Sequence, residues 1–374
     1  MQNPEKATRT RILVLVTDAF GGHGGISRFN KDFLGALCSH PKAPKVVAYP
    51  RLVKFPITES FPPGLDYEVR GVGGRLRYVR TIAIDMLRDR RFDLVVCGHI
   101  HLLPIAWLLS KLAKCPLVLI VHGIDAWTPT RSRLANRLAR YVSAFIAVSE
   151  LTSKRFAEWS GIDPAKGVVL PNCVDLSAFR PGPKNTELLA RYGLEDRTVL
   201  LTLGRLPSFE RHKGFDEVIE VLPRLAKEIP NIAYLIAGDG EDRMRLEGKV
   251  KSLGLADRVV FSGMVAESEK ADHYRLADAY VMPSRGEGFG IVLLEAMACG
   301  IPVVASKLDG SREALREGLL GELVDPLDPE DIMRGILKAL QKPRRVPEEL
   351  DYFSHASYRQ RVHQAFEDCL AISR

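Results

Sequence analysis

The sequence predicts an α/β protein built from two domains with parallel sheets. In the first half, short runs rich in aliphatic and β-branched residues alternate with helical patterns; these runs are RILVLVTDAF (11–20), FDLVVCGH (92–99), PLVLIVHG (116–123) and AFIAVSE (144–150). Such an alternation is typical of parallel strands joined by crossover helices. The pattern then starts again with TVLLTLGRL (198–206), AYLIAGDG (233–240), RVVFSGMV (258–265), AYVMPS (279–284) and PVVAS (302–306), which indicates a second domain of similar size.

The segment between the two series suits a domain junction. Residues 167–185, GVVLPNCVDLSAFRPGPKN, contain three prolines and several turn residues. We expect an N-terminal domain over residues 1–177 and a C-terminal domain over 178–352. The remaining residues, 353–374, carry the pattern of a final amphipathic helix.

Charge and cysteine usage indicate the compartment and the kind of partner. Residues 1–180 hold 26 Lys and Arg against 14 Asp and Glu, whereas the whole chain has a net charge of +7. A basic half favours an anionic partner such as a lipid surface, a phosphorylated substrate or nucleic acid, unless it is simply a solvated surface. The six cysteines show no metal-ligand spacing and suggest free thiols. With no signal peptide pattern and no membrane span, we expect a cytoplasmic protein.

A glycine cluster follows the first strand. GGHGGISRF (21–29) leads from that strand into a helix, and glycines there let the backbone approach a ligand. A helix N-terminus also attracts anions, so Gly24 and Gly25 are candidates for a phosphate or sugar site. The cluster lacks the GxGxxG pattern and the P-loop lysine, and a flexible turn is the alternative.

Two cations follow a strand of the second domain. In GRLPSFERHKGF (204–215), Arg205 ends a strand together with Gly204, and Lys213 lies just before Gly214 at the start of a helix. Arginine binds a diphosphate bidentately and lysine binds it as a point charge. The alternative is two solvated surface cations.

Two glutamates stand in the apolar stretch RGEGFGIVLLEAMACGIPVVAS (285–306). Glu287 lies on the glycine turn before the helix, and Glu295 lies inside it among apolar residues, where an unpaired carboxylate is costly. Glu295 is therefore a candidate to accept ribose hydroxyls, and Glu287 to face a sugar. Local pairing of Glu295 is the alternative.

Histidines also end two strands of the first half. His122 is a candidate catalytic residue, and His99 and His101 are candidates for acceptor contact, although such residues often only form local hydrogen bonds. There is no DxD or His–carboxylate cluster and no G-x-S-x-G, so we expect neither a metal site nor a serine nucleophile.

Together these pieces resemble the retaining glycosyltransferases of family 4. The resemblance rests on GGHGG, on GRL with HKGFDEVI, on the GDG at 238–240, and on EGFGIVLLEAMACGIPVVAS with its E-x7-E spacing. It covers nearly the whole chain. It implies the GT-B fold, in which two Rossmann-like domains face a central cleft and a C-terminal helix crosses back to the N-terminal domain.

The resemblance also implies roles for individual residues. Arg205 and Lys213 would hold the diphosphate of a sugar nucleotide, Glu295 its ribose and Glu287 its sugar. The amides of Phe289, Gly290, Ile291 and Val292 would complete the pocket, and Met264 and Val265 would contact the base. Gly24 and Gly25 would cover the diphosphate, and His122 would lie beside the sugar. The longer spacing between Arg205 and Lys213 makes Arg211 an alternative to Lys213.

We therefore expect a metal-independent hexosyltransferase that uses a nucleoside-diphosphate sugar, with retention, on a glycan or lipid-linked acceptor. The basic N-terminal half would hold the acceptor and contact an anionic inner leaflet, in polysaccharide or glycolipid synthesis. Alternatives are a sugar-nucleotide 2-epimerase of the same fold, a non-catalytic binding protein and a nicotinamide oxidoreductase, although the last needs a GxGxxG that is missing. The basic runs lack interleaved aromatics, so nucleic acid is not an expected partner.

Overall fold

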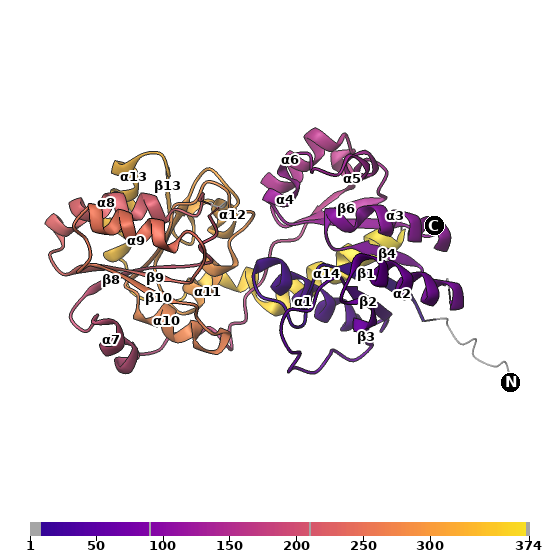
Figure 1. The fold of residues 1–374 in the computed structure, drawn as a ribbon, viewed down its shortest axis with the longest axis horizontal. Coiled ribbons are helices and arrows are strands. Elements are labelled where there is room, and N and C mark those ends of the chain that lie inside the picture. Colours follow the sequence, from indigo (N-terminus) through magenta and orange to yellow (C-terminus); the bar gives the residue numbers. More distant parts are fainter. Residues whose placement is uncertain (1–8, 90, 209–210, 372–374) are drawn as a thin grey trace. The chain divides into compact units, whose positions relative to one another are not determined.

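The computed structural model describes residues 9–89, 91–208 and 211–371. The chain divides into two compact units (Figure 1). The N-terminal unit comprises the chain up to Asn172 together with the segment that begins at His355. The C-terminal unit runs from Cys173 to Ser354.

The N-terminal unit is built on a seven-stranded sheet in the order β3-β2-β1-β4-β5-β6-β7. Its strands are β1 (Arg11–Val16), β2 (Lys45–Pro50), β3 (Leu65–Tyr67), β4 (Leu94–Cys97), β5 (Leu117–Val121), β6 (Ala144–Ala147) and β7 (Gly167–Val169). Neighbouring strands pair in parallel, with Leu13 of β1 beside Val47 of β2 and Val95 of β4. The expected parallel α/β architecture is confirmed for this unit.

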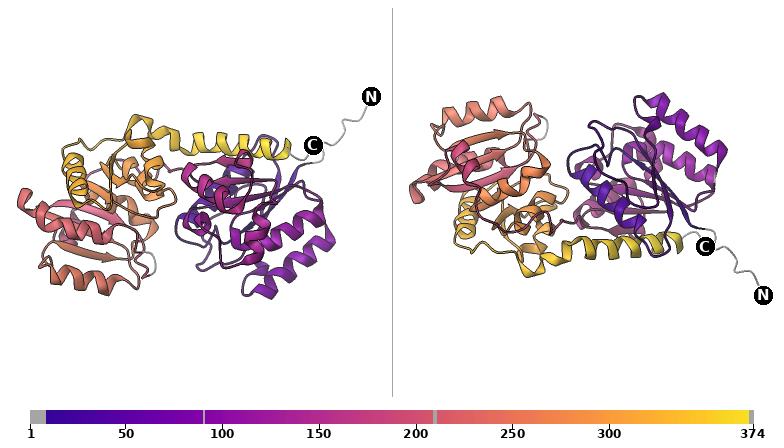
Figure 2. Two further views of the ribbon diagram at one scale, coloured as in Figure 1. Left: turned by 90° about the horizontal axis from the view of Figure 1, so that it is seen from above. Right: turned by 90° about the horizontal axis from the view of Figure 1, so that it is seen from below.

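Helices cover both faces of this sheet. They are α1 (Gly25–Cys38), α2 (Arg75–Arg88), α3 (Leu103–Ala113), α4 (Ile124–Trp127), α5 (Arg133–Ala139), α6 (Glu150–Ser160) and α14 (His355–Ala371). Alternate strand residues such as Leu13, Val95 and Leu119 form one core with α2, α3, α5 and α6. The intervening residues point to the opposite face, where α1 and α14 pack against each other (Figure 2).

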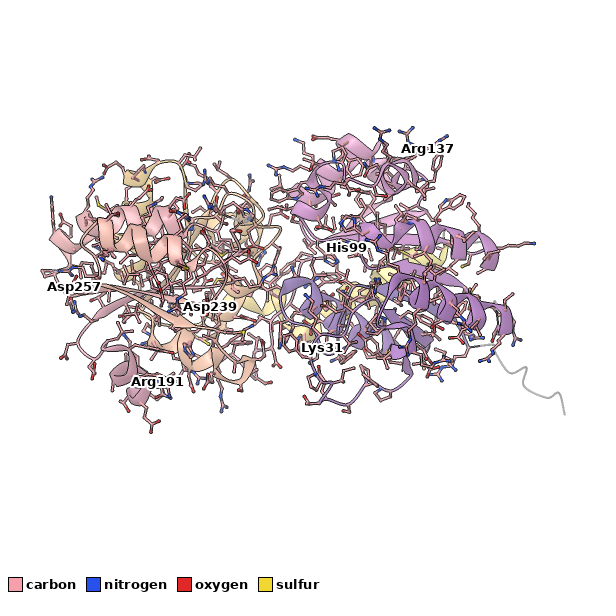
Figure 3. All side chains as sticks on the ribbon, in the orientation of Figure 1. Lys31, His99, Arg137, Arg191, Asp239 and Asp257 are labelled. Carbon is pink, nitrogen blue, oxygen red and sulfur yellow. The ribbon has the colours of Figure 1, made fainter. Side chains whose placement is uncertain are left out.

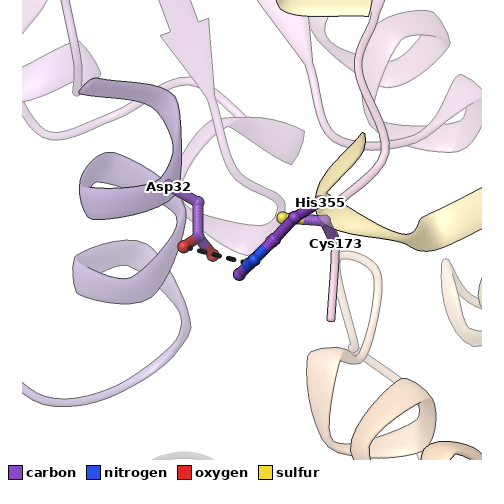
Figure 4. A group of neighbouring side chains, drawn as sticks. All are labelled: Asp32, Cys173 and His355. Carbon is purple, nitrogen blue, oxygen red and sulfur yellow. Dashed lines mark ion pairs between the residues drawn. The ribbon is translucent and has the colours of Figure 1, made fainter. Parts of the chain in front are cut away.

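Helix α14 is part of the N-terminal unit although it comes last in the chain. Tyr358, Val362 and Phe366 are buried along one of its faces. The ring of Tyr358 meets Phe29 of α1 edge to face, with 6.3 Å between centroids. At the start of the helix, His355 Nε2 lies 3.5 Å from a carboxylate oxygen of Asp32 on α1 (Figure 4).

The C-terminal unit repeats the architecture with a six-stranded sheet in the order β10-β9-β8-β11-β12-β13. Its strands are β8 (Thr198–Leu203), β9 (Ile232–Ala237), β10 (Val259–Gly263), β11 (Ala279–Met282), β12 (Val303–Ser306) and β13 (Glu322–Val324). They too pair in parallel. Its helices are α7 (Thr186–Tyr192), α8 (Phe215–Glu228), α9 (Arg243–Ser252), α10 (Lys270–Leu276), α11 (Ile291–Ala298), α12 (Ser311–Ala314) and α13 (Pro329–Leu340).

The helices of this unit also cover both faces of the sheet. Helices α8, α9 and α13 share a core with strand residues such as Leu200, Tyr234 and Val281. Helices α7, α10 and α11 lie on the other face (Figure 1). Six short 3-10 turns complete the described part of the chain: η1 (Val69–Gly71), η2 (Ile100–Leu102), η3 (Pro164–Lys166), η4 (Glu267–Glu269), η5 (Arg316–Gly318) and η6 (Glu348–Phe353).

Two further expectations are tested by the fold. The six cysteines are free thiols, as the sequence predicted. Among the helices of the described residues, none combines the length and the hydropathy that crossing a bilayer requires.

Candidate functional site

The loops that follow β8 and β11 lie side by side at the carboxyl edge of the C-terminal sheet. From β8 the chain continues to β9 and β10 on one side, and it returns to β11 on the other side. Ligands of open parallel sheets bind at such a reversal of strand order. The loop after β8 carries Arg205 and Lys213, and the loop after β11 carries Glu287.

An ion pair joins these two loops. Lys213 Nζ donates to Glu287 Oε2 at 3.0 Å, and both side chains are about one-fifth exposed. Burial by itself raises the pKa of Glu287, but the positive charge of Lys213 and its hydrogen bond outweigh that effect and hold the pKa below its usual value. Glu287 is therefore a carboxylate at neutral pH. Arg211, the alternative to Lys213, lies 3.4 Å from Asp242 instead.

A buried aspartate on the loop after β12 holds the Glu287 loop in place. Asp309 Oδ2 accepts the Ser284 hydroxyl at 2.6 Å and the backbone N–H of Glu287 at 2.8 Å, and Oδ1 accepts the N–H of Ser311 at 3.0 Å. The backbone N–H of Gly310 donates to the Glu287 carbonyl at 2.9 Å. Burial raises the pKa of Asp309 to about 6 despite these hydrogen bonds.

Glu295 lies inside α11, as the sequence predicted, and it is only 3% exposed. The hydroxyl of Tyr274 on α10 donates to its Oε2 at 2.7 Å, and Lys270 Nζ lies 3.9 Å from Oε1. These partners come from the neighbouring helix α10 and the η4–α10 junction rather than from α11 itself. A hydrogen-bonding tyrosine and a neighbouring cation explain how a carboxylate is tolerated among apolar residues.

Glycines bring the loops after β8 and β9 into close contact. Leu206 donates its N–H to the carbonyl of Asp239 at 3.0 Å. A Cβ added to Gly238 would lie 1.9 Å from the carbonyl oxygen of Gly204. Arg205 is exposed on this loop, and Met264 follows β10 with 82% of its surface exposed.

In the N-terminal unit, the glycine cluster precedes α1. Gly24 caps the helix with φ of 101°, and among the described residues no side chain caps this end. The Ser27 hydroxyl donates to the Ala19 carbonyl at 3.0 Å, and the Asn30 amide donates to that of Asp18 at 2.8 Å. These hydrogen bonds hold the loop beside the N-terminus of α1, where the first backbone N–H groups attract an anion.

The three candidate histidines lie close together in the same unit. The ring centroids of His99 (Figure 3) and His101 are 4.9 Å apart, and those of His99 and His122 are 6.3 Å apart. Burial lowers the pKa of His99 to about 3 and that of His122 to about 4, so both are neutral at pH 7. His122 Nε2 lies 2.9 Å from the Gly98 carbonyl, which can only accept, so Nε2 carries the proton and Nδ1 is an acceptor.

Comparison with known proteins assigns the family. The sequence profile of glycosyl transferases group 1 matches residues 185–360, and that of glycosyltransferase family 4 matches residues 23–178. A GDP-mannose-dependent alpha-(1-6)-phosphatidylinositol monomannoside mannosyltransferase of Mycobacterium tuberculosis is 30% identical over 347 residues, 84% of this chain and 85% of that protein. The chain belongs to the group 1 glycosyltransferases.

A second relative and a solved structure are also similar to this chain. The mannosyltransferase of the same description from Mycolicibacterium smegmatis is 35% identical over 241 residues, which are 61% of this chain and 62% of that protein. Anabaena HepE, solved in complex with UDP and glucose, has a TM-score of 0.76 at 21% identity and covers 96% of this chain and 100% of its own. This likeness shows the fold alone, and the chain is a glycosyltransferase of the GT-B fold.

Two residues of this glycosyltransferase escaped the sequence analysis. Asp309 was missed because KLDGSREA (307–314) contains no motif that we interpreted, although an aspartate directly after a buried strand is a usable signal. Tyr274 was missed because it lies 21 positions before Glu295 on another helix. Periodicity within one helix cannot reveal a partner on the next.

Proposed function

We propose that this glycosyltransferase moves a hexosyl unit, with retention, from a nucleoside-diphosphate sugar to an acceptor hydroxyl. The observation that carries the proposal is the Lys213–Glu287 pair at the reversal of strand order in the C-terminal sheet. There a lysine and a carboxylate lie 3.0 Å apart beside the N-terminus of α11. Such a place suits an anion and a sugar hydroxyl bound next to each other.

We assign the binding of the donor to residues of the C-terminal unit. Lys213 and Arg205 bind the diphosphate together with the amides of Phe289 to Val292, each charge-assisted contact contributing about 1.5–3 kcal/mol. Glu287 accepts from sugar hydroxyls and Glu295 from ribose hydroxyls, while Met264 and Val265 contact the base. When the donor binds, its diphosphate competes with Glu287 for Lys213, which leaves the Glu287 carboxylate to accept from the sugar.

Catalysis then rests on positioning and on charge stabilisation. The bond between the anomeric carbon and the diphosphate oxygen breaks, and its electron pair stays with the diphosphate that Arg205 and Lys213 stabilise. The acceptor hydroxyl attacks from the same face and gives its proton to the leaving phosphate. No metal ion is required in this scheme.

The acceptor is assigned to the N-terminal unit. His122 lies beside the transferred sugar, Gly24 and Gly25 cover the diphosphate, and His99 and His101 contact the acceptor. We take GDP-mannose as the first donor to test, because the relatives from both mycobacterial species are described as GDP-mannose-dependent. A lipid-linked acceptor at an anionic membrane suits the basic N-terminal half.

The ion pair is tested by transfer kinetics with GDP-mannose and UDP-glucose in the presence of EDTA. Replacing Lys213 by Ala should lower kcat/KM about 100-fold or more, because a preorganised cation at the leaving group is lost. The matched control is Lys342→Ala, which removes a lysine 2.6 Å from Glu322, at the opposite edge of the same sheet. Equal effects of both substitutions, or full activity of Lys213→Ala, would contradict the assignment.

Nucleotide binding separates this function from its alternatives. Saturating GDP or UDP should stabilise the protein by about 2.7 kcal/mol at 100 times Kd in a thermal-shift measurement, and Glu295→Gln should reduce the shift. Product formed from the donor without an acceptor would indicate a 2-epimerase. Binding without turnover of any donor and acceptor would indicate a binding protein.

A further inference from the structure

A second ion pair joins the two segments that carry Lys213 and Glu287. Arg285 Nη2 lies 3.0 Å from Glu217 Oε1, and the backbone N–H of Arg285 donates to the His212 carbonyl at 2.7 Å. Arg285 stands two positions before Glu287 on the loop after β11. Glu217 stands four positions after Lys213, in the first turn of α8. Each segment therefore supplies one cation and one carboxylate to the other.

Glu217 is a charge that stability alone does not explain. Its side chain is 12% exposed, and Oε2 has no hydrogen-bond partner among the residues that the structure describes. Burial raises the pKa of this carboxyl group, although its own backbone N–H and the charge of Arg285 act against that effect. The free-energy cost of removing a carboxylate from water can exceed the gain from one ion pair, so such a pair is weak evidence of stabilisation. Its position between the two segments explains it better.

The loop after β11 is held from both sides. In the sheet, β11 lies between β8 and β12. On the β12 side, Asp309 accepts the backbone N–H of Glu287 at 2.8 Å, and on the β8 side Glu217 holds the guanidinium of Arg285. The ion pair of Lys213 is a further link, but a donor diphosphate would break it by competing for the lysine. The links from Asp309 and Glu217 remain in place when it breaks.

We propose that Glu217 and Arg285 are positioning residues that keep the two segments in register while a donor diphosphate occupies Lys213. Neither side chain has to contact the donor in this role, because each acts through a neighbour in its own segment. The effect on transfer rests on the proposed function. The Glu217–Arg285 pair itself is present without substrate and can be tested without it.

Hydrogen exchange of the full chain without substrate tests the pair. Glu217→Gln should raise the exchange rates of the backbone amides of residues 286–292 about tenfold, because one of the links that hold this loop is lost. The matched control is Glu330→Gln, which removes the carboxylate that accepts from Arg224 at 2.8 Å. Arg224 also lies on α8, but that pair is on the surface, so the control should leave these amides unchanged. Equal protection of residues 286–292 in the wild type and in Glu217→Gln would overturn the proposal.

Transfer kinetics test whether the pair acts through Glu287. Glu217→Gln and Arg285→Met should each lower kcat/KM about tenfold with little change in the free energy of unfolding, whereas Arg285→Lys should keep most of the activity. In the Glu287→Gln background, Arg285→Met should have little further effect, because residues that act as one unit are not additive. A loss of the same size in that background would overturn the positioning role. If the wild type transfers no sugar, the proposed function fails, and hydrogen exchange still decides on the pair.

Discussion

Glu295 illustrates how a single buried charge is stabilised by residues that are distant in sequence. Its carboxylate is held by Tyr274 from α10 and lies 3.9 Å from Lys270. Burial and the neighbouring carboxylate raise the pKa of Tyr274 well above its usual value, so the hydroxyl stays a donor at any physiological pH. The sequence showed that a partner was needed, and the fold supplied it.

The raised pKa of Asp309 predicts how the stability of the protein depends on pH. Its pKa is raised by burial from 3.8 to about 6, so the folded protein holds a proton that the unfolded chain has already lost. The stability that this residue contributes is therefore fully present below pH 4 and is lost as the pH rises through 6. Asp309→Asn removes the ionisable group, so its free energy of unfolding should not show the decline of about 1–3 kcal/mol that the wild type shows between pH 4 and pH 8.

The same substitution should lower activity. An amide offers one oxygen where the carboxylate accepts from Ser284, Glu287 and Ser311, so the Glu287 loop is held less firmly. We expect kcat/KM to fall about tenfold. Denaturant unfolding from pH 4 to pH 8 and transfer kinetics check both parts; a stability difference that does not change with pH would refute the assigned pKa.

At the scale of elements, the strand-end loops of the C-terminal sheet are fitted to one another through their backbones. Gly310 packs on the Glu287–Gly288 backbone, since a Cβ there would lie 2.1 Å from the Gly288 carbonyl oxygen. Gly214, next to Lys213, has φ of 88° and packs against Pro283. The positions of Lys213 and Glu287 therefore depend on glycines as much as on their own ion pair.

Substitution of Gly238 tests the close packing between the loops after β8 and β9. Its φ is 147°, and an added Cβ would lie 1.9 Å from the Gly204 carbonyl oxygen, so Gly238→Ala should destabilise the C-terminal unit by about 2 kcal/mol or more. Gly248→Ala is the matched control: it lies in α9 with nothing within 4 Å of its Cβ position, and it should stabilise by up to about 1 kcal/mol. Thermal unfolding distinguishes them, and similar effects at both sites would argue against close packing at Gly238.

At the scale of the whole molecule, the chain leaves the N-terminal unit at Asn172 and re-enters it at His355. The last helix, α14, then covers α1. His363 Nε2 lies 3.0 Å from the Ala36 carbonyl, and Lys42 pairs with Glu367. The N-terminal unit is therefore completed only after the C-terminal unit has been synthesised.

Truncation after Ser354 should destabilise the N-terminal unit selectively. It removes the buried side chains of Tyr358, Val362 and Phe366, for which we expect a loss of about 4.5–9 kcal/mol at 1.5–3 kcal/mol per side chain. Hydrogen exchange should show lost protection in α1 and unchanged protection in β8 and β9, which serve as the internal control. Unchanged protection of α1 would mean that α14 adds little to this unit.

The sequence by itself determined the α/β class, the parallel sheets, the placement of Glu287 before a helix and Glu295 within it, and the family. These follow from local periodicity, from glycines at strand ends and from motif spacing, all of which are properties of neighbouring residues. Only the tertiary structure decided that Lys213 rather than Arg211 meets Glu287, that Asp309 holds the Glu287 loop, and that Tyr274 partners Glu295. Each of these contacts joins separate elements, and the sheet order that brings them together depends on packing across the whole unit rather than on any local pattern.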